Sequence, residues 1–584
     1  MKNKFQNIEL LVNMGTGSRS LNKSSFLKTL SDEGIEFETK DFRAHEKKIK
    51  QKKEIRSSRT KENLDQFENN QRFMFKSNVQ DHEINPWDLA HKLKHSMKSV
   101  SCFVEPDTVS EFVIQRKIND NEEPSHRSIG KQNDGNFDAD WMPHANTIWH
   151  LDDAHSQLMS ARKEAEELNS DKLVRIGHLD TGYDPGHPQL PPRLNTKLQR
   201  NFIPGETPTS AVDPLNKAVL YMPGHGTGTL GILAGGKFVG NGFNDKIGGA
   251  PFAEIIPCRI SNTVVLIKTS EFAQALNYLS ALHKSGEMVH IVSMSMGGAP
   301  SQAWADAVNE AYESGILMVS AAGNNYNGIP IRKLVYPARF ERVIAACGAT
   351  FEDAPYYHKK IGEMQGNYGP SKSMNYALAA YTPNMPWAVS ENKALSFSGA
   401  GTSSATPQIA AAAACYLKKY YEEITALPEP WMRVEAVRNA LYTSAAKKVN
   451  SVLEENDYRS YFGNGILRAS DALKITVPKK GNNLIKAKDA DVGWFPILST
   501  IFRSVESATA SPDAQGLNML NIELAQISYH NTELNKLMNN DEIEFLGLSK
   551  KKKGEILDFL ICLPETSMTL KSFLKNNYKS FISM

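Results

Sequence analysis

The sequence is poor in cysteine, and its few cysteines follow no pattern that builds a disulfide framework or a metal site. The 584 residues include only five: Cys102, Cys258, Cys347, Cys415 and Cys562. None forms a C-x-x-C pair, and three lie in apolar runs typical of buried side chains. The scarcity predicts a chain that folds without disulfides, as proteins of reducing compartments do.

Long apolar runs are also missing. The longest, from Ile409 to Leu417, is far shorter than the roughly 20 residues that span a bilayer. The amino-terminal stretch MKNKFQNIELLVNMGTG has no apolar core after its lysines, so we expect no secretory signal. Together with the cysteine usage, this predicts an intracellular, cytoplasmic protein without a membrane span.

The chain also lacks an excess of either charge: it has 67 basic and 65 acidic residues, and its net charge is +2. That balance excludes a general attraction to nucleic acid or anionic membranes. The polar run from His45 to Phe73 is basic at its start, which leaves a nucleic-acid-associated protein as one alternative. A solvated linker is the simpler interpretation, because no aromatic residues alternate with the charges. We therefore expect no nucleic-acid partner.

What the chain does have is a regular alternation of strands and helices. From Val174 onward, short runs rich in Val, Ile and Ala alternate with helical patterns such as SEFAQALNYLSALHKSG. Strands that are apolar on both faces indicate a parallel sheet covered by helices on both sides. The fold class predicted is therefore α/β, and functional residues should lie where the strands end.

The segment from Gly399 to Leu417, GAGTSSATPQIAAAAACYL, predicts a buried helix that begins with small residues. Pro407 suits the first turn of such a helix, where a missing N–H costs nothing. Ser403 would then lie beside unpaired backbone N–H groups at the positive end of the helix dipole. A serine placed there can attack a carbonyl group, provided that a base activates it.

Three upstream motifs supply such partners. Asp180 ends an apolar run and is followed by Thr-Gly, His225 lies between glycines in GHGTGTLG, and Asn324 follows the run LMVSAAG. In this order, the four motifs D-T-G, G-H-G-T, A-A-G-N and G-T-S-x-A-x-P resemble those of the subtilisin-like serine proteases (subtilases, peptidase family S8). The resemblance covers about residues 146–475.

The resemblance implies a serine endopeptidase that cleaves peptide or protein substrates through an acyl-enzyme and needs no cofactor for the chemistry. Ser403 would be the nucleophile, His225 the general base and Asp180 the group that orients it. Asn324 would donate to the oxyanion. The alternatives left open are a pseudoprotease or binding scaffold, and a regulated protease in peptide maturation or defence. No residue of the catalytic set is missing, which favours an active enzyme.

Substrate-binding residues follow from the same resemblance. Ser295, Met296, Gly297 and Gly298 resemble the strand that pairs with the substrate backbone. Val335 precedes a Tyr-Pro pair near the family's specificity pocket, at a position where many relatives carry glycine. A valine there would make the pocket shallower and favour small or medium apolar residues before the scissile bond.

Calcium, which many subtilases bind, remains open. The loop after the predicted His225 helix contains Asn241, Asn244 and Asp245 but also lysines. It lacks a clear pattern of oxygen ligands, so we assign no metal site.

Composition divides the chain into five predicted segments. The subtilase-like catalytic domain covers residues 146–475, after a polar linker at residues 116–145. Residues 71–115 form a prodomain-like α/β segment, in which Glu105-Pro106 resembles the ending of an inhibitory prodomain. Residues 1–70 are an extension with the basic polar segment. Residues 476–584 predict a mainly helical accessory region that could hold a partner. The polar linker is where a prodomain would be cut from the mature enzyme.

Overall fold

The structure is a computed structural model of the chain. The residues that it describes are 9–14, 37–42, 71–77, 85–96, 102–108, 148–168, 170–218, 221–240, 243–264, 267–326, 331–356, 364–390, 393–448, 458–493, 497–498, 512–538 and 545–583. The predicted linker 116–145, the basic part of residues 45–61 and Asn241 lie outside these ranges.

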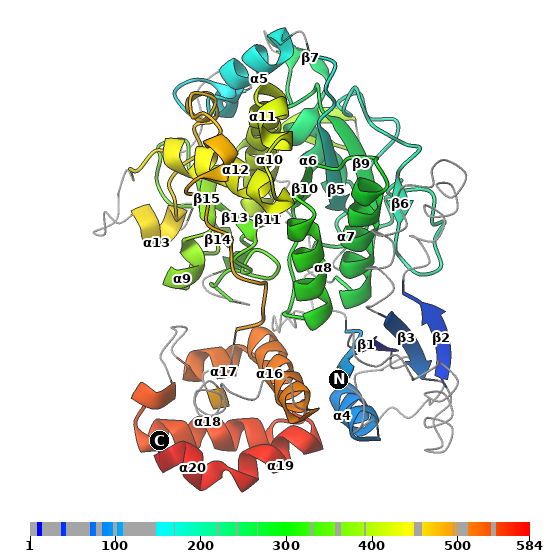
Figure 1. Ribbon diagram of the computed structural model, residues 1–584, viewed down its shortest axis with the longest axis vertical. Helices are drawn as coiled ribbons and strands as arrows, with labels where there is room; N and C mark the ends of the chain where they lie inside the picture. Colours follow the sequence, from blue (N-terminus) through cyan, green and yellow to red (C-terminus); the bar gives the residue numbers. More distant parts are fainter. Residues whose placement is uncertain are drawn as a thin grey trace, which may run out of the picture.

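A parallel sheet of seven strands forms the centre of the molecule, in the order β15-β13-β11-β10-β5-β9-β6 (Figure 1). Its strands are β5 (Arg175–Asp180), β6 (Arg200–Asn201), β9 (Glu254–Arg259), β10 (Ile291–Met294), β11 (Leu317–Ala321), β13 (Val343–Ala349) and β15 (Ala377–Tyr381). Most of these strands are buried along their whole length, because helices cover both faces. The predicted α/β fold class is confirmed.

Two layers of helices enclose the sheet. On one face lie α5 (Leu158–Glu167), α6 (His225–Ala234), α10 (Thr402–Lys419) and α12 (Pro430–Ser444). On the other lie α7 (Thr269–Lys284) and α8 (Gln302–Glu313), which form the apolar core there. Helix α10 runs through the middle of its layer and is buried from Thr402 to Leu417, as its run of alanines predicts.

Shorter elements surround this core. They are η2 (Trp149–Leu151), β7 (Lys237–Gly240), β8 (Phe243–Lys246), β12 (Asn324–Tyr326), β14 (Met364–Gly366), α9 (Ser371–Met374), β16 (Met385–Val389), β17 (Ala394–Gly399), α11 (Tyr421–Thr425), α13 (Tyr458–Phe462), α14 (Ala469–Ala472) and η3 (Lys479–Gly481).

A separate antiparallel sheet lies at the amino-terminal end, in the order β2-β3-β1-β4. Its strands are β1 (Glu9–Met14), β2 (Phe37–Asp41), β3 (Gln71–Ser77) and β4 (Cys102–Pro106), with helix α4 (Pro86–Ser96) against them. Strands from residues 1–70 and from residues 71–115 therefore share one sheet, with β1 paired to both β3 and β4.

The carboxyl-terminal region is helical, as predicted. It contains α16 (Pro512–His530), α17 (Thr532–Leu537), η4 (Phe545–Gly547), α18 (Lys550–Cys562), α19 (Met568–Asn576) and α20 (Tyr578–Ser583) around its own apolar core. No helix in the described ranges is long and apolar enough to cross a membrane.

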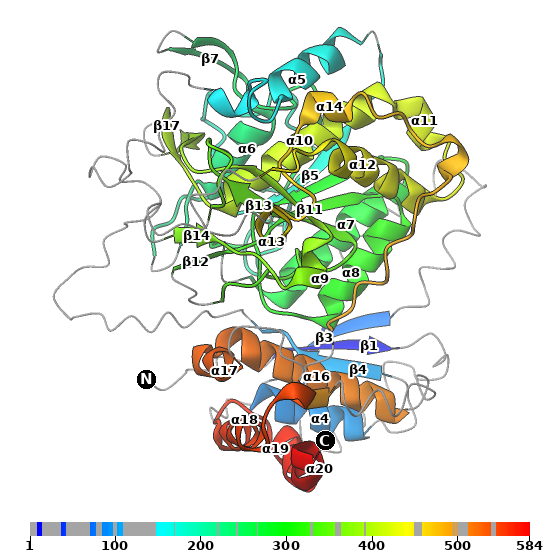
Figure 2. The same ribbon diagram turned by 90° about the vertical axis from the view of Figure 1, so that its left-hand side faces the viewer.

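The two terminal regions lie side by side below the central sheet (Figures 1 and 2). The indole Nε1 of Trp87 in α4 donates to the side-chain oxygen of Gln526 in α16 at 3.1 Å. One turn after Trp87 in α4 and one turn before Gln526 in α16, His91 Nε2 lies 2.9 Å from Glu523 Oε2. Both side chains are buried. Helix α16 therefore contacts the amino-terminal sheet domain through specific polar pairs.

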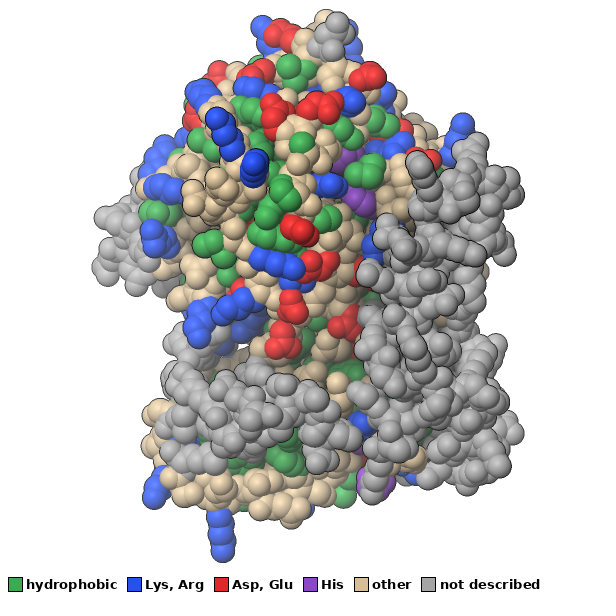
Figure 3. Space-filling model, in the orientation of Figure 1, with side chains coloured by type: hydrophobic (Ala, Val, Ile, Leu, Met, Phe, Trp, Pro, Cys, Tyr) green, Lys and Arg blue, Asp and Glu red, His purple; other side chains and the backbone are tan. Residues whose placement is uncertain are grey.

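Side chains of both charges are spread over the described part of the face in Figure 3. Both signs of charge occur on this face, and the chain as a whole is nearly neutral.

Candidate active site

Asp180 and His225 meet at the carboxyl-terminal edge of the sheet. Asp180 is the last residue of β5, and His225 is the first residue of α6. The Nδ1 atom of His225 lies 2.7 Å from Asp180 Oδ1, and the aspartate has no exposed surface. Burial alone would raise the pKa of Asp180, but the adjacent His225 outweighs it and holds that pKa below its usual value. The carboxylate is therefore ionised and fixed against the imidazole.

Glycines next to His225 permit this close packing. A Cβ atom at Gly226 would lie 2.0 Å from the carbonyl oxygen of Gly182. A Cβ atom at Gly228 would collide with the ring of Trp387, which also packs edge-on against His225 with 5.4 Å between ring centroids. Sequence reasoning missed Trp387, since only the tertiary fold brings β16 beside α6.

A threonine and a second histidine complete the surroundings of Asp180. Thr229 Oγ1 lies 3.1 Å from Asp180 Oδ2 and 2.9 Å from Nε2 of the buried His178. Burial lowers the pKa of His178 to about 4, so its ring is neutral near pH 7. Thr229 is four residues after His225 on one helix, and this spacing is a sequence signal that could have revealed it.

Ser403 is the second residue of α10 and is almost completely buried. Its hydroxyl donates to the backbone oxygen of Ser295 at 3.1 Å, and the Ser295 hydroxyl donates to the Ser403 carbonyl at 2.9 Å. These two bonds fasten the segment after β10 to the start of α10.

The predicted position of Pro407 in the first helical turn is wrong. The helix begins at Thr402, so Pro407 lies inside it. Because proline has no N–H, it cannot donate to the carbonyl of Ser403 four residues earlier. The Ser295 hydroxyl takes that place, which explains how a proline is accommodated within a buried helix.

Asn324 lies next to the start of α10, where β12 begins. Its side-chain oxygen accepts from the Thr402 backbone N–H at 2.9 Å. Because this bond occupies the side-chain oxygen of Asn324, the orientation of the amide is fixed and its nitrogen can act as a donor. Gly401, at a φ of 74°, approaches so closely that a Cβ atom there would lie 2.9 Å from Asn324 Nδ2. Only glycine suits that conformation.

The predicted substrate-binding residues lie along one extended segment after β10. Met296 is buried in the core, whereas Gly298 pairs with Tyr336 through bonds of 2.8 and 3.2 Å. Within the described chain, the N–H and C=O groups of Gly297 have no hydrogen-bond partner. An extended peptide could supply both partners by lying alongside.

Val335 lies across this segment, with its backbone N–H bonded to the Ala322 carbonyl at 3.0 Å. Its two methyl groups lie 2.2 and 2.7 Å from where Cβ atoms of Gly297 and Gly323 would be. The valine therefore fills the space that the two glycines leave open.

The loop considered for calcium has few side-chain oxygens available to bind a cation. The Asp245 carboxylate is paired with the Arg162 guanidinium at 2.8 Å, and Asn244 is exposed. Nowhere among the described residues do three or more His, Cys, Asp or Glu side chains gather in a metal-binding group. A structural calcium ion gains no support from this loop.

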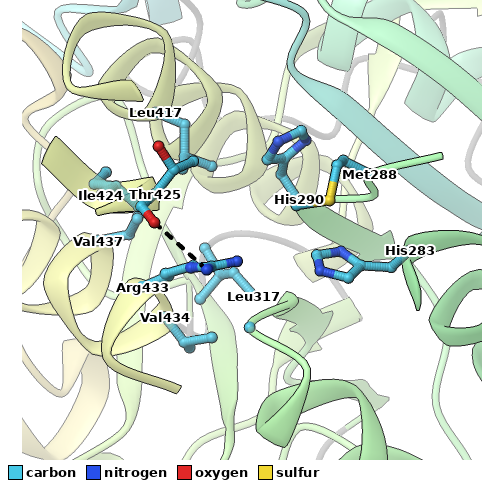
Figure 4. Close-up of a pocket in the computed structure, with 11 residues that line it drawn as sticks. His283, Met288, His290, Leu317, Leu417, Ile424, Thr425, Arg433, Val434 and Val437 are labelled. Carbon is cyan, nitrogen blue, oxygen red and sulfur yellow. Dashed lines mark hydrogen bonds between the residues drawn. The ribbon is translucent and has the colours of Figure 1, made fainter. Parts of the chain in front are cut away.

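A small cavity lies at the opposite edge of the sheet, near the starts of β10 and β11. His283, His290 and Arg433 surround it together with apolar side chains (Figure 4). Its volume of about 10 Å³ holds roughly one water molecule. It is therefore too small to bind a peptide side chain.

The parallel sheet covered by helices and the buried Asp–His pair at its edge define an α/β protein with a candidate acid–base pair. The Subtilase family (Peptidase S8) profile matches residues 171–465, just over half of the chain. The chain belongs to the subtilase family. It is a serine endopeptidase whose substrates are peptides or proteins, and catalysis in this family needs no cofactor.

Two subtilisins are similar to this chain over most of their own length. Subtilisin DY of Bacillus licheniformis is 25% identical over 316 residues, covering 54% of this chain and 96% of the relative. Subtilisin Savinase of Lederbergia lenta is 26% identical over 302 residues, covering 52% and 91%. Among solved structures, the prenylagaramide maturation protease PagA is 19% identical with a TM-score of 0.39, covering 54% of this chain and 97% of that one.

Proposed function

We propose that Asp180, His225 and Ser403 form the catalytic triad of this endopeptidase. The observation that carries the proposal is the 2.7 Å contact between Asp180 and His225. Helix α6, which His225 begins, packs against α10, which carries Ser403 in its first turn. Asp180 holds the Nδ1–H tautomer of His225, so the other ring nitrogen is free to accept the proton of Ser403. The serine oxygen then attacks the peptide carbonyl and forms an acyl-enzyme, which water hydrolyses.

The Ser403 hydroxyl must turn before it reacts, because it now donates to the Ser295 carbonyl. A bound peptide can bring this about, since a peptide N–H lying against that carbonyl replaces the serine as donor. The hydroxyl is then released toward His225. Binding and activation of the nucleophile are thereby coupled.

Two donors would stabilise the oxyanion of the tetrahedral intermediate. Asn324 Nδ2 is oriented by the bond between its side-chain oxygen and the Thr402 N–H. The backbone N–H of Ser403 lies in the first turn of α10, where helix N–H groups have no partner within the helix. Donors fixed in this way need no reorganisation as charge develops.

We further propose that the amino-terminal sheet domain is an inhibitory prodomain, cleaved within residues 116–145. The Glu105 carboxylate accepts from the N–H groups of Gln302 and Ala303 at 3.1 and 2.8 Å, at the start of α8. Asp107 accepts from the Ser270 N–H at 2.9 Å, at the start of α7. Both acids interact favourably with the helix dipoles. This docking supports a tightly bound domain.

A cytoplasmic location is part of the proposal. All five cysteines are free, and four of them are buried. Free buried thiols fit a reducing compartment. An additional partner at residues 476–584 also remains a proposal, and α16 already uses part of that surface to contact α4.

The test is labelling of the full-length protein with a fluorophosphonate probe, followed by mass mapping and assay against a peptide library. We expect the label on Ser403 and cleavage of peptides. Labelling of another residue would reassign the nucleophile. A folded protein that neither labels nor cleaves would favour the pseudoprotease alternative.

A further inference from the structure

Two segments fastened to the start of α10 would form the walls of a recess for a substrate side chain next to Ser403. One wall is the segment after β10, fastened to Ser403 through Ser295. The other contains Gly323 and Asn324, fastened to Thr402. Val335 lies between the two walls, with its methyl groups against Gly297 and Gly323. A substrate side chain that enters beside the nucleophile must therefore meet Val335.

A residue from the carboxyl-terminal region lies in the same apolar cluster. Tyr529 of α16 packs with Ala299, Ile331 and Val335, and each of the four is at most 5% exposed. Burial and the nearby Tyr336 raise the pKa of Tyr529 well above its usual value, so its ring remains neutral. No other member of the cluster comes from outside the catalytic domain.

Helix α16 is fixed at this place on both sides. Gln526, one turn before Tyr529, donates to the carbonyl oxygen of Pro300 at 2.9 Å and accepts from Trp87 at 3.1 Å. Pro300 lies two residues after Gly298, the last residue of the substrate-binding segment. The turn of α16 that carries Tyr529 is thus fixed by neighbours in two other domains. Figure 2 shows α16 below the catalytic domain, next to α4 and the amino-terminal strands.

We propose that Tyr529 forms the floor of the specificity recess behind Val335, so that the carboxyl-terminal helical region helps to select the substrate. This inference rests on the proposed function of Ser403. The valine cannot swing aside cheaply because it is β-branched, and the buried ring prevents it from moving backward. The substrates selected are peptides with a small or medium apolar residue before the scissile bond.

The test compares kcat/KM for peptides that differ only in this residue, carrying Ala, Leu or Phe. The enzymes are wild type, Val335→Gly, Tyr529→Ala and the double variant, with Tyr529→Phe as the matched control. We expect Val335→Gly to raise the Phe-to-Ala ratio by roughly 5- to 150-fold. Adding Tyr529→Ala should raise it further, by at least about fivefold, because the floor is then removed.

Tyr529→Ala alone should also raise the Phe-to-Ala ratio, by less than Val335→Gly does, because Val335 can then move into the space that the ring leaves. Tyr529→Phe should match wild type. A ratio is independent of the amount of folded enzyme. If the alanine variant does not fold, the double variant Val335→Gly with Tyr529→Leu replaces it. Its Phe-to-Ala ratio should lie between the ratio of Val335→Gly and the ratio expected for Val335→Gly with Tyr529→Ala.

Two kinds of failure can be distinguished. If the double variant has the same ratio as Val335→Gly while Ser403 still labels with fluorophosphonate, the role of Tyr529 is refuted and the proposed function stands. If Ser403 does not label and no peptide is cleaved, the proposed function itself fails and the inference fails with it.

Discussion

Ser295 and Ser403 are joined by two reciprocal hydrogen bonds, each from a side-chain hydroxyl to the other residue's carbonyl oxygen, at 2.9 and 3.1 Å. The pair connects the substrate-binding segment to the nucleophile. It also satisfies a helix carbonyl that Pro407 leaves without a partner.

The first prediction concerns this pair. Ser295→Ala leaves the buried Ser403 carbonyl without its donor and should destabilise the protein by about 1–3 kcal/mol. Ser293→Ala is the matched control, because the Ser293 hydroxyl is buried and has no hydrogen-bond partner among the described residues. Urea unfolding followed by tryptophan fluorescence measures both. Equal losses in the two variants would show that the Ser295 bond contributes nothing specific.

The second prediction concerns the nucleophile. Ser403→Ala should lower turnover on the order of 10⁶-fold, which is the magnitude found when the nucleophile of a subtilisin is removed. Ser404→Ala should remain active, since its hydroxyl donates to the Ala400 carbonyl at 3.1 Å. Peptide hydrolysis and fluorophosphonate labelling provide the readout. Activity retained by the Ser403 variant and lost by the Ser404 variant would reverse the assignment.

The third prediction concerns the oxyanion donor. Asn324→Ala should reduce kcat by about 10²–10³-fold with little change in KM, because the donor acts on charge that appears only in the transition state. That magnitude also comes from a subtilisin. Steady-state kinetics on one peptide substrate measures it. A rise in KM with unchanged kcat would instead place Asn324 in substrate binding.

The fourth prediction concerns acid stability. Burial lowers the pKa of His290 to about 3 and that of His178 to about 4, against about 6.5 in the unfolded chain. The unfolded state therefore binds more protons between these values. The stability is fully present above pH 6.5 and is lost as the pH falls toward the folded values.

For His290 the loss from pH 7 to pH 4.5 should be about 2–3 kcal/mol. His290→Asn keeps an acceptor for the Arg175 N–H but does not titrate, so it should lose less stability over this range than wild type. His95→Asn, on an exposed position of α4, is the control. Urea unfolding at pH 7 and pH 4.5 measures the loss. If wild type and His290→Asn lose the same unfolding free energy between the two pH values, the prediction is wrong.

The fifth prediction concerns processing. Wild type should be cleaved within residues 116–145 during expression, whereas Ser403→Ala should keep its full length. The amino-terminal fragment should co-elute under native conditions, held by Glu105, Asp107 and the His91–Glu523 pair. Intact mass spectrometry measures both effects. Identical full-length masses, with no rise in activity after limited proteolysis, would argue against an inhibitory prodomain.

Local sequence patterns were enough to predict the fold class and the candidates for catalysis. Apolar strands alternating with helical patterns predicted the parallel sheet, and short motifs singled out Asp180, His225, Asn324 and Ser403. Both signals are local, since hydrophobic periodicity and glycine-flanked turns depend on neighbouring residues. The positions of Asp180 at a strand end and of Ser403 at a helix start followed directly from them.

The further residues that share the site could be found only in the folded chain. The Ser295 hydroxyl replaces the donor that Pro407 lacks, Trp387 packs against His225, and Tyr529 lies in one cluster with Val335. These contacts join residues far apart along the chain, and no local pattern encodes them. They depend on how whole helices and sheets pack, because a buried side chain's neighbours are set by the complementary shapes of the elements around it.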